Sequence, residues 1–255
     1  MTKVDIQILS PGKLSSRKEG QLIFDLWKNY LPAVLPEKYG NWEPLKAVFD
    51  PNRIEPALNA WQWPFLAKRK IPRMDSSIWM RFGPKLEHAS WCISIDKRAI
   101  DENGLLRFLR AASVALKADF ACITILTPNE ISRGREQKTV LALDKAATRF
   151  AFSIASRDLQ RRVPDLYWAT ILGAPYLELL GKERMLVTPI HNVEVVSGDT
   201  VLFQLTDSLA AFEYSPERVE DDRKKAKVHL GASAFFEKTL EASGQYATPK
   251  FTFCQ

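Results

Sequence analysis

The chain has 255 residues and a mass of 29.0 kDa, with 46% hydrophobic and 26% charged residues. These values are typical of a globular protein and exclude disorder, collagen and coiled coil as descriptions of the whole chain. The net charge of +6 and the pI of about 9.2 describe a mildly basic protein. Such a charge favours polyanions, anionic membranes or acidic partners, although so small an excess is explained by solubility alone.

The cysteines and the N-terminus indicate the compartment. Cys92, Cys122 and Cys254 form no CxxC pair, so the sequence predicts no disulfide framework. Residues 1–5 lack the apolar core of a signal peptide, and no stretch approaches the roughly 18 apolar residues of a membrane-spanning helix. We expect a soluble cytoplasmic protein without membrane attachment, in which Cys92 and Cys122 are small core residues.

The chain opens with a strand and a capped helix. Alternating apolar residues predict a strand over residues 4–8. Ser16 and Glu19 have the spacing of a capping box, and the helical pattern that follows ends before Pro32. Residues 32–75 contain seven prolines. They are predicted to form a long, ordered, aromatic-rich connection with a short helix near its middle, and a loop of this length is often functional.

A hairpin, a helix and a buried strand follow. Residues 78–82 and 91–95 alternate around the turn signal Gly83-Pro84, which predicts a β-hairpin. Apolar residues then trace one helical face over 105–116. The nearly continuous apolar run 120–126 is typical of a buried strand.

The second half of the chain is less regular. Residues 127–165 are mixed and charged, and 138–155 fit a helix or a strand. Beyond them the sequence predicts strands at 167–172, 186–189 and 193–196, a short helix at 175–180 ended by Gly181, a turn at 197–199, a half-buried strand at 201–205, and a charged helix from Pro216 to about Val228.

The order of these elements predicts an α+β fold with a mostly antiparallel sheet and packed helices. We expect a single domain over residues 1–255, with a weak boundary near 130–165. Two sets of core residues are predicted: Trp91, Ile93 and Ile95 on one face of a strand, and Phe108, Leu109 and Leu116 buried against a sheet.

Catalytic motifs are missing from the sequence. It contains no GxSxG elbow, no GxxxxGK[ST] phosphate loop and no GxGxxG fingerprint. His88, His191 and His229 have no ligand partner at metal-binding spacing and are interpreted as surface or capping residues. Glu136 and Lys138 have the spacing of a nuclease pair but lack an upstream aspartate in a matching strand. We expect no enzyme activity, no catalytic residue, no metal and no cofactor.

Two charged segments are candidate binding surfaces. Residues 61–70 interleave aromatic with basic side chains, which suits single-stranded nucleic acid or a protein partner, although the aromatics could instead anchor the connection to the core. The acidic cluster Glu217–Asp222 precedes several basic residues, an order that complements a helix dipole and predicts a solvated helix.

Several short strings, in this order, resemble a known family. They are Leu35–Gly40 with Glu43-Pro44, Trp61 through Phe65, Tyr167-Trp168, Leu172–Tyr176, Gly181–Arg184, Gln204–Asp207 and Val228–Gly231. The chain resembles bacterial immunity proteins of contact-dependent and polymorphic toxin systems, among them the family called immunity protein fifty-two. The resemblance covers residues 30–235, and the matching residues are carried over as fold determinants.

The resemblance implies a cytoplasmic protein that binds a cognate toxin domain and blocks it without catalysis, as in type VI secretion. Immunity proteins against nucleases are often acidic, whereas this chain is basic. The resemblance therefore implies an acidic toxin, a local acidic patch or steric blocking.

Three functions remain in competition. The first is the toxin-neutralising immunity protein, and the alternative is a nucleic-acid-binding or regulatory protein that uses segment 61–73. The third is an enzyme with an unrecognised carboxylate site. We favour a protein partner over nucleic acid, with the acidic cluster Glu217–Asp222 as the second choice of surface. The predicted partner-binding residues are Trp61, Trp63, Lys68, Arg69 and Lys70.

Overall fold

The computed structural model describes residues 3–81 and 87–253. The chain separates into two compact units, one of residues 1–121 with the C-terminal residues from Thr252, and one of Cys122–Phe251. Both units combine helices with antiparallel strand pairs, which confirms the predicted α+β fold. The single domain with a weak boundary near 130–165 stays a prediction. Within the described ranges, no helix is long and apolar enough to cross a membrane.

The first unit contains a sheet in the order β1-β6-β5-β4-β2-β3, and each neighbouring pair is antiparallel. The predicted hairpin is confirmed as the β5–β6 pair, while its turn at Gly83-Pro84 lies outside the described residues. The elements of this unit are β1 (Lys3–Ser10), α1 (Arg17–Tyr30), β2 (Lys38–Gly40), β3 (Ala47–Val48), α2 (Glu55–Asn59), β4 (Phe65–Arg69), β5 (Met74–Trp79), β6 (Ala89–Asp96), α3 (Glu102–Ala115) and the start of β7 (Phe120–Ile125).

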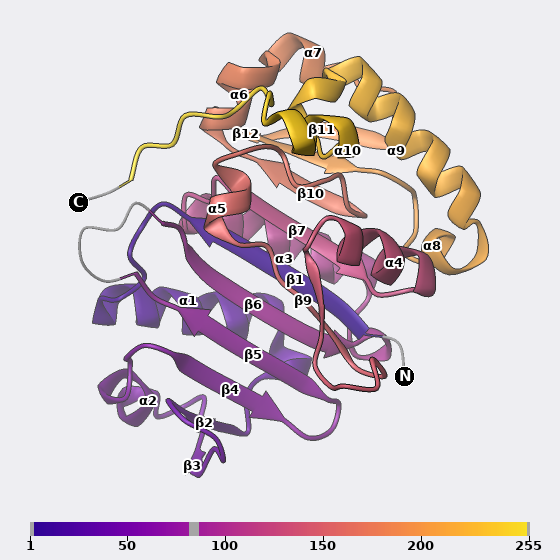
Figure 1. Ribbon diagram of the computed structural model, residues 1–255. Coiled ribbons are helices and arrows are strands. Elements are labelled where there is room, and N and C mark those ends of the chain that lie inside the picture. Colours follow the sequence, from indigo (N-terminus) through magenta and orange to yellow (C-terminus); the bar gives the residue numbers. More distant parts are fainter. Residues whose placement is uncertain (1–2, 82–86, 254–255) are drawn as a thin grey trace. The chain divides into compact units, whose positions relative to one another are not determined.

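Helices α1 and α3 cover one face of this sheet (Figure 1). The capping box at the start of α1 is confirmed, because the Ser16 side chain accepts from the Glu19 backbone N–H and the Glu19 carboxylate accepts from that of Ser16. Trp91 of β6 lies 5.7 Å from the ring of Trp27 in α1 and 5.3 Å from that of Phe108 in α3. The two predicted sets of core residues are confirmed as buried.

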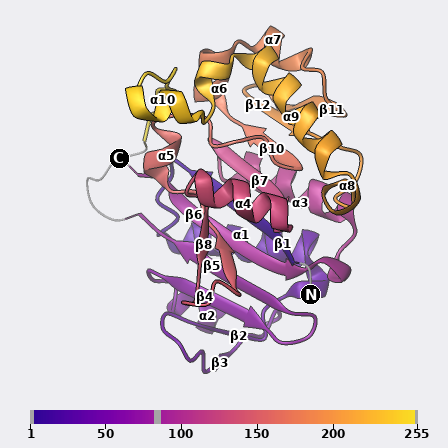
Figure 2. The same cartoon turned by 45° about the vertical axis from the view of Figure 1, so that its right-hand side comes forward.

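The short helix predicted within residues 32–75 is confirmed as α2, but the rest of the segment is not a long connection, because it carries β2, β3, β4 and the start of β5. Figure 2 shows β2 and β3 at the edge of the sheet, beside β4. Proline is tolerated at strand ends and turns, where its missing N–H breaks no ladder bond. Four of the seven prolines stand at such positions: Pro36 before β2, Pro44 between β2 and β3, Pro64 before β4 and Pro72 between β4 and β5.

Trp61 anchors the segment between α2 and β4 to the core. Its indole Nε1 donates to the Leu14 carbonyl at 3.0 Å, and its ring lies 4.8 Å from that of Phe65 and 5.4 Å from that of Phe24. Gly20 of α1 makes this position possible, since a Cβ there would lie only 2.8 Å from Trp61 Cδ2. The helix and the indole therefore fit together only where the helix lacks a side chain.

In the second unit, β12 pairs with both β11 and β10, antiparallel in each case, and β7 follows β10 in the strand order. The ambiguous residues 138–155 form the small β8–β9 hairpin. The elements are α4 (Pro128–Glu136), β8 (Val140–Ala142), β9 (Phe150–Phe152), α5 (Ser156–Leu159), β10 (Ala169–Leu172), α6 (Ala174–Leu180), α7 (Lys182–Leu186), β11 (Asn192–Ser197), β12 (Thr200–Gln204), α8 (Ala211–Tyr214), α9 (Pro216–Leu230) and α10 (Lys238–Ser243).

Two predictions in this unit were wrong. Residues 186–189 do not form a strand, because Leu186 ends α7 and the Thr188 hydroxyl donates to the Met185 carbonyl at 2.8 Å. Strand β12 is not half-buried but buried along its whole length, so side chains on both of its faces are covered. The buried strand β7 and the helix ended by Gly181 are confirmed.

The fit between α1 and Trp61 gives a first prediction. We expect Gly20→Ala to lower the free energy of unfolding by about 1–2 kcal/mol, because overpacking at a buried ring outweighs the gain in helix propensity. Gly198→Ala is the control, since nothing lies within 4 Å of a Cβ there. Urea denaturation measures both variants, and equal stability would contradict the proposed fit.

Candidate functional site

The five predicted contact residues are close in sequence but do not share one surface. Trp61 is buried, with 7% of its surface exposed, whereas Trp63 is 47% exposed. Lys68 and Arg69 are neighbours in β4, so their side chains point to opposite faces of the sheet. Their role in partner binding stays a prediction, and the position of Trp61 in the core supports a structural role for that residue.

Arg69 holds the chain that leads into β2. Its Nη1 donates to the Leu35 carbonyl at 3.2 Å and lies 3.6 Å from the Glu37 carboxylate. The same carboxylate accepts from the backbone N–H of Lys70 at 2.9 Å. Arg69 is thus engaged within the unit, on the face opposite to Lys68.

Trp63 belongs to a surface that also includes Trp79, which was not among the predicted contact residues. Its ring lies 5.6 Å from that of Trp79 at 67°, an edge-to-face pair, and Trp79 is 44% exposed. A signal for Trp79 exists in the sequence. It alternates with Ile78 and Met80, which are buried, and therefore had to point to the other face of β5.

The loop that carries Trp63 is fixed by Asn41. The Nδ2 atom of this side chain lies within hydrogen-bond distance of three carbonyl oxygens, at 3.3 Å from Ala60, 3.0 Å from Gln62 and 2.9 Å from Pro64. Together with buried Trp61, these contacts hold Trp63 in place on the surface. The result is a pair of exposed indoles in contact with each other, one on a loop held by hydrogen bonds and one on a strand, and exposed aromatic residues of this kind are typical of interface hot spots.

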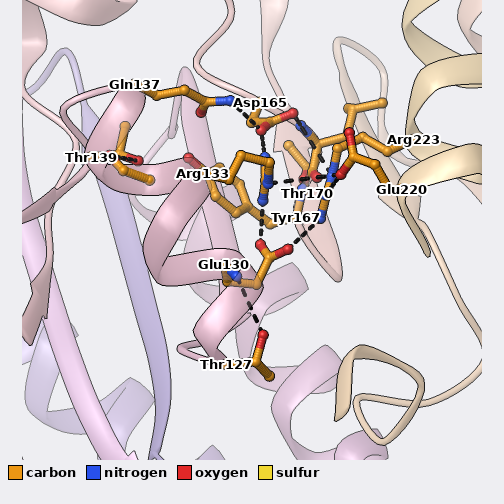
Figure 3. A network of polar contacts seen from close by, with 12 residues as sticks. Thr127, Glu130, Arg133, Gln137, Thr139, Asp165, Tyr167, Thr170, Glu220 and Arg223 are labelled. Atoms are coloured by element: carbon orange, nitrogen blue, oxygen red, sulfur yellow. Dashed lines mark hydrogen bonds and ion pairs between the residues drawn. The ribbon is translucent and has the colours of Figure 1, made fainter. Parts of the chain in front are cut away.

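The second unit contains a different cluster, a network of buried ion pairs. Arg223 of α9 is 1% exposed, and its Nη2 lies 3.1 Å from the Glu130 carboxylate of α4. Its Nε donates to the Leu166 carbonyl at 2.9 Å. Figure 3 shows Arg133 and Arg223 among the carboxylates of Glu130, Asp165 and Glu220.

The charged side chains of the network pair with one another. Arg133 contacts both Glu130 and Asp165, and the Lys227 ammonium lies 2.6 Å from Asp165 Oδ1. Burial acts to raise the pKa of Glu130, but Arg223 and Arg133 outweigh burial and hold the pKa below its usual value. A carboxylate held ionised in this way is a poor general acid near neutral pH, so the arrangement favours a structural role.

The predicted helix from Pro216 is confirmed as α9, and Glu217, Glu220 and Asp221 of its acidic cluster are exposed as predicted, but one side of the helix is buried. Residues Val219, Arg223, Ala226 and Leu230 of α9 are buried and recur at helical spacing. Arg223 occupies a position in this apolar stripe, and that position indicates a buried arginine. The many other charged residues of the helix made this indication easy to miss. Within the acidic cluster, Glu220 pairs with Arg223, while Glu217 is exposed at the rim of a cavity of about 400 Å³ between α4 and α8–α9.

His88 is also not the surface or capping residue that was predicted. Its side chain is buried, with Nε2 3.0 Å from the Asp119 carboxylate and the ring 5.0 Å from that of Phe253. His191 is exposed before β11, and His229 Nε2 lies 2.9 Å from the Arg184 carbonyl. Among the residues that the structure describes, no three His, Cys, Asp or Glu side chains are arranged to hold a metal ion.

Of the two cysteines predicted to be core residues, one is confirmed. Cys122 is buried, whereas Cys92 is partly exposed on β6. Although the residue is partly exposed, the protein atoms around its thiol keep water away and raise the pKa of the Cys92 thiol to about 11, so the thiol is protonated near neutral pH. Cys254 lies outside the described residues.

The two tryptophans of segment 61–70 should behave differently on truncation. We expect Trp61→Ala to cost roughly 3–5 kcal/mol of folding stability, because it empties a buried site. Trp63→Ala should cost about 1 kcal/mol, the usual value of an exposed aromatic pair. Chemical denaturation of both variants measures the difference, and similar losses would show that Trp63 is also a core residue.

Arg223 offers a matched test of the buried network. Arg223→Met leaves the Glu130 carboxylate without one of its cations and should cost roughly 3–5 kcal/mol. Arg218→Met on the same helix is the control, because Arg218 is exposed and lies 3.8 Å from Asp222. It should change stability by less than about 0.5 kcal/mol. Thermal melting compares the two, and an unchanged midpoint for Arg223→Met would refute the structural role.

Comparison with known proteins adds a likeness of fold. No protein-family model matches the chain, so the resemblance to immunity protein fifty-two is not confirmed, and none of the curated proteins compared with it matches. Among solved structures, the T6SS (type VI secretion) protein PA0821 of Pseudomonas aeruginosa is similar with a TM-score of 0.52 and 13% sequence identity. The alignment covers 99% of this chain and 88% of that chain, so the chain shares its fold with a type VI secretion protein.

Proposed function

We propose that the protein is an immunity protein that binds and neutralises a cognate bacterial toxin in the cytoplasm. It acts by stoichiometric binding, without catalysis, metal or cofactor. Two observations support this proposal: the exposed, fixed pair of tryptophans in the first unit, and the fold shared with a type VI secretion protein.

The tryptophan pair carries the proposal. Large exposed apolar side chains are unfavourable in water, and contiguous ones on a folded surface mark interaction sites. Trp63 and Trp79 already have fixed positions, so a partner that covers them loses little conformational entropy on binding. Rigid indoles at the centre of an interface are among its strongest contributors to affinity.

The basic residues of segment 61–70 do not favour nucleic acid. Lys68 forms ion pairs with Glu43 and Asp75, and Arg69 lies on the other face with Glu37. A nucleic-acid groove needs a continuous row of cations that follows the phosphates. Segment 61–70 instead presents Trp63, which pairs with Trp79, and cations whose neighbours are the carboxylates of Glu37, Glu43 and Asp75. Such a mixture of aromatic side chains and charges of both signs is typical of a protein interface.

The test is co-expression with the product of the neighbouring gene that has a variable C-terminal toxin domain. We expect the protein to restore growth of cells that produce this toxin and to co-purify with it at equal stoichiometry. An unrelated toxin of the same secretion system is the control and should be neither bound nor neutralised. Growth arrest despite soluble protein, with no complex on size-exclusion chromatography, would overturn the proposal.

A further inference from the structure

The face of β2, β4 and β5 that points away from α1 has an ordered pattern. On β5 this face carries Asp75, Ser77 and Trp79, which alternate with buried residues. The strand register places Ser77 beside Leu66 of β4, and Leu66 beside Gly40 of β2. The next row places Asp75 beside Lys68, and Lys68 beside Lys38. The three strands therefore present three successive zones across one face.

The zones differ in chemistry. One end is aromatic, with Trp79 and the Trp63 ring packed against it. In the middle zone the side chains project little from the sheet on either side of Leu66, because Gly40 has no side chain and Ser77 has a short one. The other end is charged. Asp75 and Trp79 are four residues apart on one strand, so the aromatic and charged ends are separated by about 13 Å.

The charged end has an excess of cations. Asp75 is shared by Lys3 at 3.8 Å, Lys68 at 3.9 Å and Arg73 at 3.1 Å, and Lys68 also pairs with Glu43. Lys38 is exposed beside Lys68 and has no ion-pair partner within the described part of the chain. Even with Asp5 counted among the nearby carboxylates, four cations face three acids at this end.

We propose that this face is where the toxin docks, and that the toxin presents an acidic protein surface with one projecting apolar side chain. The apolar side chain lies against Trp63 and Trp79, and a carboxylate of the toxin pairs with Lys38, in the charged row about 13 Å further along the strands. This inference rests on the proposed function and states which surface of the protein binds the toxin. A protein fits better than a nucleic acid, since Glu43 and Asp75 would repel a continuous phosphate chain.

Two single substitutions test the two ends separately. Trp79→Ala should weaken toxin binding at least 30-fold, mainly through faster dissociation, because it removes a central apolar contact. Lys38→Glu should slow association, and the difference from wild type should shrink as salt rises. Binding kinetics with the purified toxin domain at low and high salt measure both effects, and melting curves verify that each variant is folded.

Two matched controls lie off this face. Lys18→Glu reverses an exposed charge on α1, which covers the other side of the sheet, and Tyr214→Ala truncates an aromatic that is 82% exposed in the second unit. Both should bind the toxin like wild type. Lys38→Glu does not depend on the packing of Trp79, so it remains informative if Trp79→Ala fails to fold.

The outcomes separate the two proposals. If wild type binds the toxin and Trp79→Ala and Lys38→Glu bind as tightly as the controls, this surface is wrong while the proposed function stands. If wild type does not bind the toxin, the proposed function itself fails. If Lys38→Glu instead abolishes salt-dependent binding of a single-stranded oligonucleotide and leaves toxin binding unchanged, the face is a nucleic-acid site and the inference is overturned.

Discussion

The close packing of Trp61 on α1 determines how the first unit presents its surface. The indole lies where Gly20 has no side chain, and its N–H donates to the Leu14 carbonyl. This contact fixes the start of the short loop before β4, and Asn41 fixes the rest of that loop. A tryptophan in the core thus places a second one, Trp63, two residues later, on the outside. The burial of Trp61 and the exposure of Trp63 therefore both follow from the packing of Trp61 on α1.

The second unit is organised by charge. The guanidinium of Arg223 is buried, so its N–H groups need hydrogen-bond and ion-pair partners within the protein. These partners are Glu130, Glu220 and the Leu166 carbonyl. Taking these charges out of water is costly, and removing one partner would leave another uncompensated. The network therefore links α4, the segment before β10 and α9 through contacts that each need the others in place.

Local patterns predicted the first unit better than the second. The capping box at Ser16 and the alternation around Trp91 depend on neighbours within one element, and both were found as expected. Strands β2 and β4 escaped prediction because each is short and flanked by proline. Arg223 escaped because its partners are distant in sequence, and the contact between Trp63 and Trp79 depends on a pairing of strands that spacing does not reveal.

Along β4 and β5, side chains alternate between the core and the outer face, so folding and partner binding constrain alternate residues. Phe65, Ala67 and Ile78 face the helices, so substitutions there are limited by folding. Leu66, Lys68 and Trp79 face outward from the same strands, so they can change without disturbing the core. A lineage under pressure to match a changing partner can therefore diversify every second residue of these strands while the intervening ones remain constant. Related sequences would then vary along this segment with a period of two.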